Sequence, residues 1–163
     1  MVPLLKYVPL NQAKKVILDV LFDNAATRLL NLNLGAHVDD LIVLAERGVD
    51  LQKTMGVLRA CDGRLAWLGE GLENSWGWLH IIREKRLQQI RDKFGPVPLE
   101  KVEQMIYETM KDGQVTKYVP GDRITYTKEF PDKNGVLAPF SVGVSDRSTG
   151  ISPGRVMTAH ADD

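Results

Sequence analysis

Arg123-Ile-Thr-Tyr-Thr-Lys-Glu-Phe130 is the stretch that decides the fold, because polar and apolar side chains alternate along it with a period of two. This period is typical of a half-buried strand, and the β-branched and aromatic residues favour the same assignment. A second run of this kind covers 138–144, and Asn134-Gly135 between the two runs favours a tight hairpin turn. The stretch therefore predicts an antiparallel hairpin.

Further strands flank this hairpin. Period-two runs at 117–119 and 155–160 predict one strand before it and one after it. Turn sequences at Pro120-Gly121 and 146–150 separate these strands from the hairpin. The four runs together predict an antiparallel meander.

Upstream of the meander the hydrophobic period is mostly helical. Leu65 to Leu68 is a short apolar run that predicts a strand. A helix capped by Ser75 should end near Phe94, and another helix should cover 99–112. The predicted class is α+β, with helices packed on one face of the antiparallel sheet.

The first 61 residues predict a helical N-terminal region. After a short extended start with Pro3 and Pro9, helices are expected at 11–30, at 36–47, and at 51–60 after an Asp50 cap. At Asp62-Gly63 the pattern changes from helical periodicity to turns and short runs. The sequence therefore predicts two domains, 1–61 and 62–163.

Composition excludes several classes of protein. Cys61 is the single cysteine, so no intramolecular disulfide can form, and one cysteine with three scattered histidines has no zinc-site spacing. We expect no metal and no cofactor. No apolar run reaches the ~18 residues of a membrane span, so no membrane anchor is expected. The expected site of action is the cytoplasm, either of the cell that makes the protein or of a cell into which another cell delivers it.

Charge argues against sequence-blind binding of nucleic acid. The chain has 21 Lys and Arg against 21 Asp and Glu, whereas such binders are usually basic. Only the segment 83–93 is locally basic, with five cations and two anions. A run like this is usually a solvated helix face. The alternative is a local patch for RNA around Arg83, Lys85 and Arg86.

Alternation also assigns strand side chains to faces. Along 123–130, one side carries Ile124, Tyr126, Lys128 and Phe130, and the other carries Arg123, Thr125, Thr127 and Glu129. In the last strand the same rule groups Val156, Thr158 and His160 opposite Arg155, Met157 and Ala159. Each of these residues also has an ordinary structural role, since Thr and Tyr are good strand formers and Arg123 can pair with Asp122 or Glu129.

Cutting a phosphodiester without metal needs a base for the 2'-hydroxyl proton, an acid for the leaving 5'-oxygen, and fixed cations for the phosphate. Two histidines with Arg or Lys meet these needs. His80 lies near a predicted helix start, where the helix dipole favours neutral imidazole, and the other reading is a half-buried histidine with a satisfied hydrogen bond. His37, beside Asp39 and Asp40, is better explained by helix capping.

Residues 62–163 resemble the Barnase, EndoU, colicin and RelE superfamily of small metal-independent ribonucleases, which occur as toxin domains of bacterial polymorphic toxins and in phage head proteins. The resemblance rests on order and motifs: Trp78-x-His80-Ile81-Ile82, Lys111-Asp112-Gly113, Arg123-x-x-Tyr126, Val142-x-Val144 and Gly154-Arg-Val-Met-Thr-Ala-His160. It implies that His80, Arg123 and Thr158 line a cleft. Arg83 and Glu84 stand where a second histidine often follows in such domains.

The resemblance implies a ribonuclease, with tRNA as one expected substrate, that forms a 2',3'-cyclic phosphate. The expected catalytic residues are His80, Arg123, Tyr126, Thr158 and His160, and the expected substrate-binding residues are Arg83, Lys85, Arg86 and Lys128. The histidines would be the acid and base, Arg123 and Lys128 the phosphate clamp, and Tyr126 and Thr158 orienting donors. A toxin would also need an acidic immunity protein that covers the basic patch.

Two rival readings stay open. One is a non-catalytic interaction factor, such as a phage-encoded inhibitor or assembly protein, that uses the sheet as a binding platform. It predicts that His80 and His160 lie far apart and that no cleft collects Arg123. The other is nucleotide-directed chemistry, for which the chain has no Gly-rich phosphate loop and no GxSxG elbow.

Overall fold

The computed structural model describes residues 10 to 161, so the predicted extended start with Pro3 and Pro9 lies outside the described residues. The elements in chain order are α1 (Leu10–Leu21), α2 (Asn24–Asn31), α3 (Val38–Glu46), the 3-10 turn η2 (Leu51–Lys53), β1 (Thr54–Arg59), β2 (Leu65–Gly69), α4 (Gly77–Ile81), α5 (Glu84–Phe94), α6 (Leu99–Asp112), β3 (Gln114–Val119), β4 (Arg123–Pro131), β5 (Leu137–Ser145) and β6 (Val156–Ala161). The predicted α+β class is confirmed.

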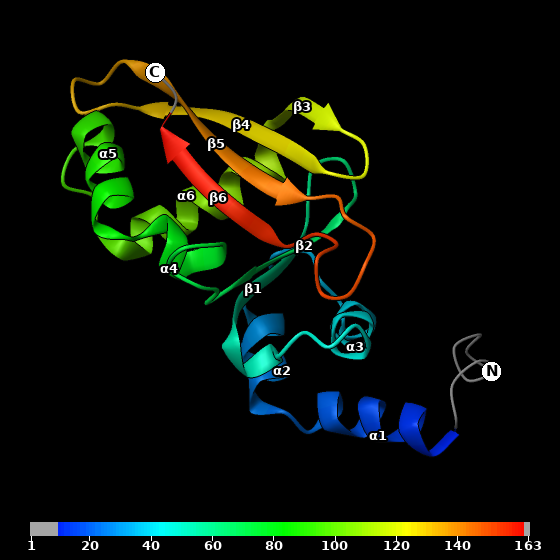
Figure 1. The fold of residues 1–163 in the computed structure, drawn as a ribbon. Coiled ribbons are helices and arrows are strands. Elements are labelled where there is room, and N and C mark those ends of the chain that lie inside the picture. Colours follow the sequence, from blue (N-terminus) through cyan, green and yellow to red (C-terminus); the bar gives the residue numbers. More distant parts are fainter. Residues whose placement is uncertain (1–9, 162–163) are drawn as a thin grey trace.

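The predicted meander is also confirmed. β3, β4, β5 and β6 form a four-stranded antiparallel sheet in that order, and β1 pairs with β2 in a second sheet. Helix α6 packs against β4 and β5, and Figure 1 shows it behind the strands. The structure therefore has helices on one face of the sheet, as the sequence predicts.

The larger core lies between this face and the helices. Ile81 of α4, Ile90 of α5 and Ile106 of α6 pack there with Tyr126 and Phe140 of the sheet, and all five are at most 1% exposed. Aromatic rings add edge-to-face contacts around Phe140. Burial of these side chains is what holds the helices on the sheet.

The β1–β2 hairpin lies between two cores. Its Leu58 and Ala66 belong to the larger core, whereas Val57 and Trp67 belong to a smaller core with α1, α2 and α3. Figure 1 shows the hairpin between these helices and the four-stranded sheet. This hairpin spans the predicted boundary at 61/62 and contributes side chains to both cores. The division into two domains therefore stays a prediction.

The predicted helix at 51–60 is wrong. A 3-10 turn is followed there by strand β1, which pairs with β2 through Val57 with Trp67 and Leu58 with Ala66. Both faces of β1 are buried, and a short apolar run buried on both sides has no period that separates strand from helix. The first 61 residues are therefore not helical throughout.

The predicted helix at 11–30 is two helices. The chain breaks at Asp23, whose carboxylate accepts a hydrogen bond from the Ala25 backbone N–H at 2.8 Å and so caps α2. An Asp in this position competes with helical backbone bonds and starts a new helix instead. The helix predicted at 36–47 is confirmed as α3, and that at 99–112 as α6.

The single helix predicted from Ser75 to Phe94 is also wrong. Trp76 precedes α4, no side chain caps that helix, and α5 starts only at Glu84. Ile81 and Ile90 are nine residues apart, about two and a half turns, so one continuous helix would point them in opposite directions. The break lets both side chains reach the same core.

No helix within residues 10–161 combines the length and the apolar character needed to cross a membrane.

Candidate functional site

The face of the sheet turned away from the helices is polar. Strand pairing joins Thr127 to Ser141 and Ser141 to His160, and joins Thr125 to Gly143 and Gly143 to Thr158. Paired residues share a face, so these side chains lie together, opposite the core positions. We call this surface the polar face; its members are Arg123, Thr125, Thr127 and Glu129 of β4, Ser141 and Gly143 of β5, and Thr158 and His160 of β6.

One predicted face assignment is wrong. Val156 was expected beside Thr158 and His160, but it is fully buried in the larger core together with Ala159. The pairing of β5 with β6 shifts between Gly143 and Val144, which pair with Thr158 and Val156. This β-bulge inserts Met157 as an extra residue and moves Val156 to the other face.

A row of hydroxyl groups crosses the polar face. The Thr116 and Thr127 Oγ1 atoms are 2.8 Å apart, and Thr127 Oγ1 is 2.8 Å from Ser141 Oγ. Ser141 is the strand partner of His160. We call Thr116, Thr127 and Ser141 the hydroxyl row. It leads from the edge strand β3 to the imidazole on β6.

Arg123 lies beside Thr158 over the one position of this face that has no side chain. A Cβ on Gly143 would be 3.2 Å from Thr158 Cγ2, 3.4 Å from Arg123 Cδ and 3.6 Å from an Arg123 guanidinium nitrogen. Arg123 pairs with no carboxylate among residues 10–161. The Thr158 Oγ1 atom is buried and has no hydrogen-bond partner among them either. A cation without a described carboxylate partner therefore lies beside the Thr158 side chain, whose methyl group faces Gly143.

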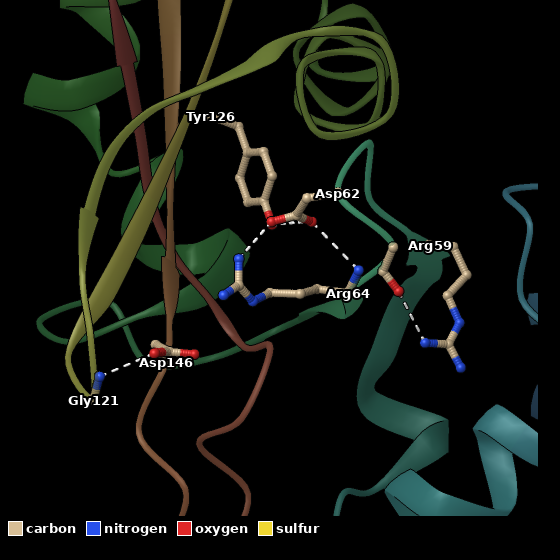
Figure 2. A network of polar contacts seen from close by, with 7 residues as sticks. Arg59, Asp62, Arg64, Gly121, Tyr126 and Asp146 are labelled. Atoms are coloured by element: carbon tan, nitrogen blue, oxygen red, sulfur yellow. Dashed lines mark hydrogen bonds and ion pairs between the residues drawn. The ribbon is translucent and has the colours of Figure 1, made fainter.

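Tyr126 lies on the opposite face, in the core. Its hydroxyl donates a 2.9 Å hydrogen bond to Asp62, whose other oxygen pairs with Arg64 (Figure 2). Burial, reinforced by the carboxylate of Asp62, raises the pKa of Tyr126 above its ordinary value. The Arg64 guanidinium also lies over the Tyr118 ring. This group ties β4 and β3 to the turn of the β1–β2 hairpin.

Figure 2 also shows a second link near the ends of the strands. The Asp146 carboxylate, just after β5, accepts a 2.9 Å hydrogen bond from the Gly121 backbone N–H in the β3–β4 turn. Arg147 adds an ion pair to Asp122 of the same turn. These contacts hold the turn that precedes Arg123.

Lys128 also lies on the helix side. Its Nζ is 3.2 Å from a Glu108 carboxylate oxygen and 5.1 Å from the centre of the Phe130 ring. Because its charge is already paired, Lys128 does not join Arg123 as a second clamp on the polar face.

His80 is carried by a helix of the core side. The ring atom Nδ1 lies 2.9 Å from the backbone oxygen of Glu73, and the next residue, Ile81, is fully buried in the larger core. Arg83 and Lys85 line a nearby hollow that also holds the acids Glu73, Glu84 and Asp92. Arg86 lies in the first turns of the same helix, α5. The structure thus groups Arg123, Thr158 and His160 and separates them from His80, Tyr126, Lys128 and the basic segment.

Sequence reasoning did not single out some residues of the polar face. Lys117 pairs with Thr125 in the sheet, so its cation adds to the same face. Ser141 and Gly143 belong to the site because strand pairing places them between residues of β4 and residues of β6. Alternation within one strand shows which side a residue takes, but it carries no information on register between strands.

Within residues 10–161, no three His, Cys, Asp or Glu side chains are grouped so that they could hold a metal ion. Comparison with protein-family models and with curated proteins found no match to this chain.

Proposed function

We propose that this chain is a ribonuclease that acts without a metal ion, and that the polar face is its active site. The observation that carries the proposal is the placement of Arg123 beside Thr158 on the face that holds His160. Arg123 has no described carboxylate partner, so its charge is available to a ligand. A guanidinium next to hydroxyl donors is well suited to a phosphate group.

In the proposed reaction the 2'-oxygen of a ribose attacks the adjacent phosphorus. His160 takes the proton of the 2'-hydroxyl, and the bond from phosphorus to the 5'-oxygen breaks to leave a 2',3'-cyclic phosphate. The departing 5'-oxygen takes a proton from water. Arg123 stabilises the negative charge that builds on the phosphate oxygens, and Thr158 packs beside Arg123 over Gly143. These side chains supply the required base and cation.

The proposal revises the roles expected from the resemblance. His80, Tyr126 and Lys128 already contact Glu73, Asp62 and Glu108, and none of the three is on the polar face, so they are not part of the proposed active site. A chain of zero net charge suits a structured RNA held at a local site better than unselective binding. We therefore propose tRNA as the first substrate to test.

A non-catalytic interaction factor is the second candidate. The observation that favours it is that His80 and His160 are carried on opposite sides of the sheet, because α4 packs on the core side of β6 while His160 lies on the polar face. In this role the polar face would be a docking platform for another macromolecule.

The two candidates are distinguished by incubating the purified full chain with total tRNA and with an unstructured RNA in EDTA. The ribonuclease proposal predicts cleavage that falls by about 100-fold or more in His160→Ala and in Arg123→Ala. Arg47→Ala, which removes an exposed cation after α3, is the matched control and should cleave at the wild-type rate.

Three results would contradict the proposal. Absence of cleavage by the wild type favours the interaction factor. Cleavage that survives both substitutions removes the polar face as the site. Loss of cleavage in His80→Ala, with His160→Ala unaffected, would move the site to the helix side.

A toxin role in the cytoplasm and an acidic immunity protein stay predictions. Induced expression of the wild type should arrest growth, whereas expression of His160→Ala should not. A partner that binds the polar face should relieve the arrest.

A further inference from the structure

A hollow opens on the polar face beside the hydroxyl row. Thr116 and Thr127 of the row line it together with Glu129 and Pro139, and the end of α6 closes it through Asp112. Glu129 and Pro139 are strand partners on the polar face. The hollow therefore shares two hydroxyls with the row that leads to His160.

Its position fits the nucleotide next to the reacting phosphate. Thr127 is two strands away from His160, through Ser141. Adjacent strands are about 4.8 Å apart, so the two backbones are separated by about 10 Å. A nucleotide whose phosphate contacts Arg123 and His160 can place its base at this distance.

Lys128 also lines the hollow, but its charge is paired with Glu108, so the lining suits a base better than a phosphate. Glu129 is exposed and makes no hydrogen bond or ion pair with residues 10–161, so its carboxylate is an unused acceptor that repels phosphate oxygens. A carboxylate accepts hydrogen bonds and, when ionised, donates none. The ring of Pro139 supplies an apolar wall.

Carboxylate acceptors discriminate between nucleobases. Cytosine, adenine and guanine each carry an exocyclic amino group that donates hydrogen bonds, whereas uracil has a carbonyl oxygen at each of its exocyclic positions and its imino N3–H as the single ring donor on that edge. Placing those oxygens against Glu129 would leave both partners without a donor.

We propose that this hollow is a nucleobase subsite in which Glu129 selects bases with an exocyclic amino group and rejects uracil. The inference rests on the proposed ribonuclease function and adds its substrate specificity.

The test uses the full chain and DNA oligonucleotides that contain one ribonucleotide, because a single 2'-hydroxyl fixes the bond that is cut. In one series the base of the ribonucleotide is varied, and in a second series the base that follows it is varied. The preference should appear in the series that varies the base bound in the hollow. In that series we expect cleavage with cytosine, adenine or guanine to be about 10-fold faster than with uracil or thymine.

Glu129→Gln should reduce that preference to less than about 3-fold, because the amide can donate to the uracil oxygen. Glu100→Gln is the matched control; Glu100 is exposed in the first turn of α6 and should keep the wild-type preference. Melting curves of both variants should match the wild type, since both side chains are on the surface.

The outcomes separate the inference from the function on which it rests. If the wild type cuts no RNA at all, both are overturned. If it cuts all bases equally, or if Glu129→Gln keeps the full preference, only the subsite is overturned and the ribonuclease proposal stands.

Discussion

Replacing Tyr126 by Phe removes one hydroxyl from a buried contact between the sheet and the β1–β2 turn. The ring is fully buried, and its hydroxyl donates to Asp62 at 2.9 Å. A hydrogen bond to a charged group contributes about 1.5–3 kcal/mol. Asp62 is 23% exposed and keeps its pairing with Arg64, so water can replace the lost donor and the lower end applies. We expect a loss of about 1.5 kcal/mol.

For a chain of this size, that loss corresponds to a fall in melting temperature of about 3–6 °C. Thermal unfolding followed by circular dichroism measures it. Tyr118→Phe is the control, because Tyr118 is 47% exposed and its hydroxyl bonds to no residue that the structure describes. The control should stay within about 0.5 kcal/mol of the wild type. Equal melting temperatures for wild type and Tyr126→Phe would refute the stabilising role of this contact.

The stability difference between wild type and Tyr126→Phe should depend on pH. The pKa of Tyr126 is raised in the folded protein, above the value of about 10 that tyrosine has in an unfolded chain. The stabilisation is therefore complete below about pH 10, and it is lost as pH rises above that value because the unfolded chain ionises first. The gap in melting temperature between wild type and Tyr126→Phe should narrow above pH 10. A constant gap would contradict the assigned cause.

Three further substitutions test the site and the fold. Gly143→Val places side-chain atoms where Arg123 and Thr158 now approach to 3.4 and 3.2 Å, so RNA cleavage should fall by about 10-fold or more; unchanged cleavage would argue against this geometry. Ile81→Ala empties a fully buried position and should lower the free energy of unfolding in urea by about 2–5 kcal/mol, whereas Leu79→Ala, at a 43% exposed position, should have a much smaller effect. Asp23→Ala removes the cap of α2 and should lower thermal stability by about 0.5–2 kcal/mol, an effect that Asp23→Asn should largely avoid.

Local patterns were sufficient for most elements of the second half. Alternation from Arg123 to Phe130 and the turn at Asn134-Gly135 predicted the β4–β5 hairpin, because a period of two and a turn with positive φ are properties of adjacent residues. The bounds of α6 were predicted for the same reason, since Gly113 ends the helix directly.

Errors arose where distant parts of the chain decide the local conformation. Strand β1 is buried on both sides, so its sequence lacks the alternation of a half-buried strand, and only pairing with β2 and burial between two cores make it a strand. Likewise, the break between α4 and α5 lets Ile81 and Ile90 pack in the same core, and no local signal marks it. Tertiary packing outweighs helix propensity, which differs by less than about 1 kcal/mol per residue for most side chains.

The sequence by itself determined the α+β class, the order of the meander and the side of β4 on which Arg123 lies, because each depends on periodicity within one element. Only the tertiary structure decided that Arg123, Thr158 and His160 share a face, while Tyr126 lies in the core, Lys128 pairs with Glu108 of α6, and His80 is carried by α4. That grouping depends on the register between strands and on the bulge at Met157, where one extra residue exchanges the two faces. Register is set by hydrogen bonds and packing between residues far apart in the chain, which no local pattern contains.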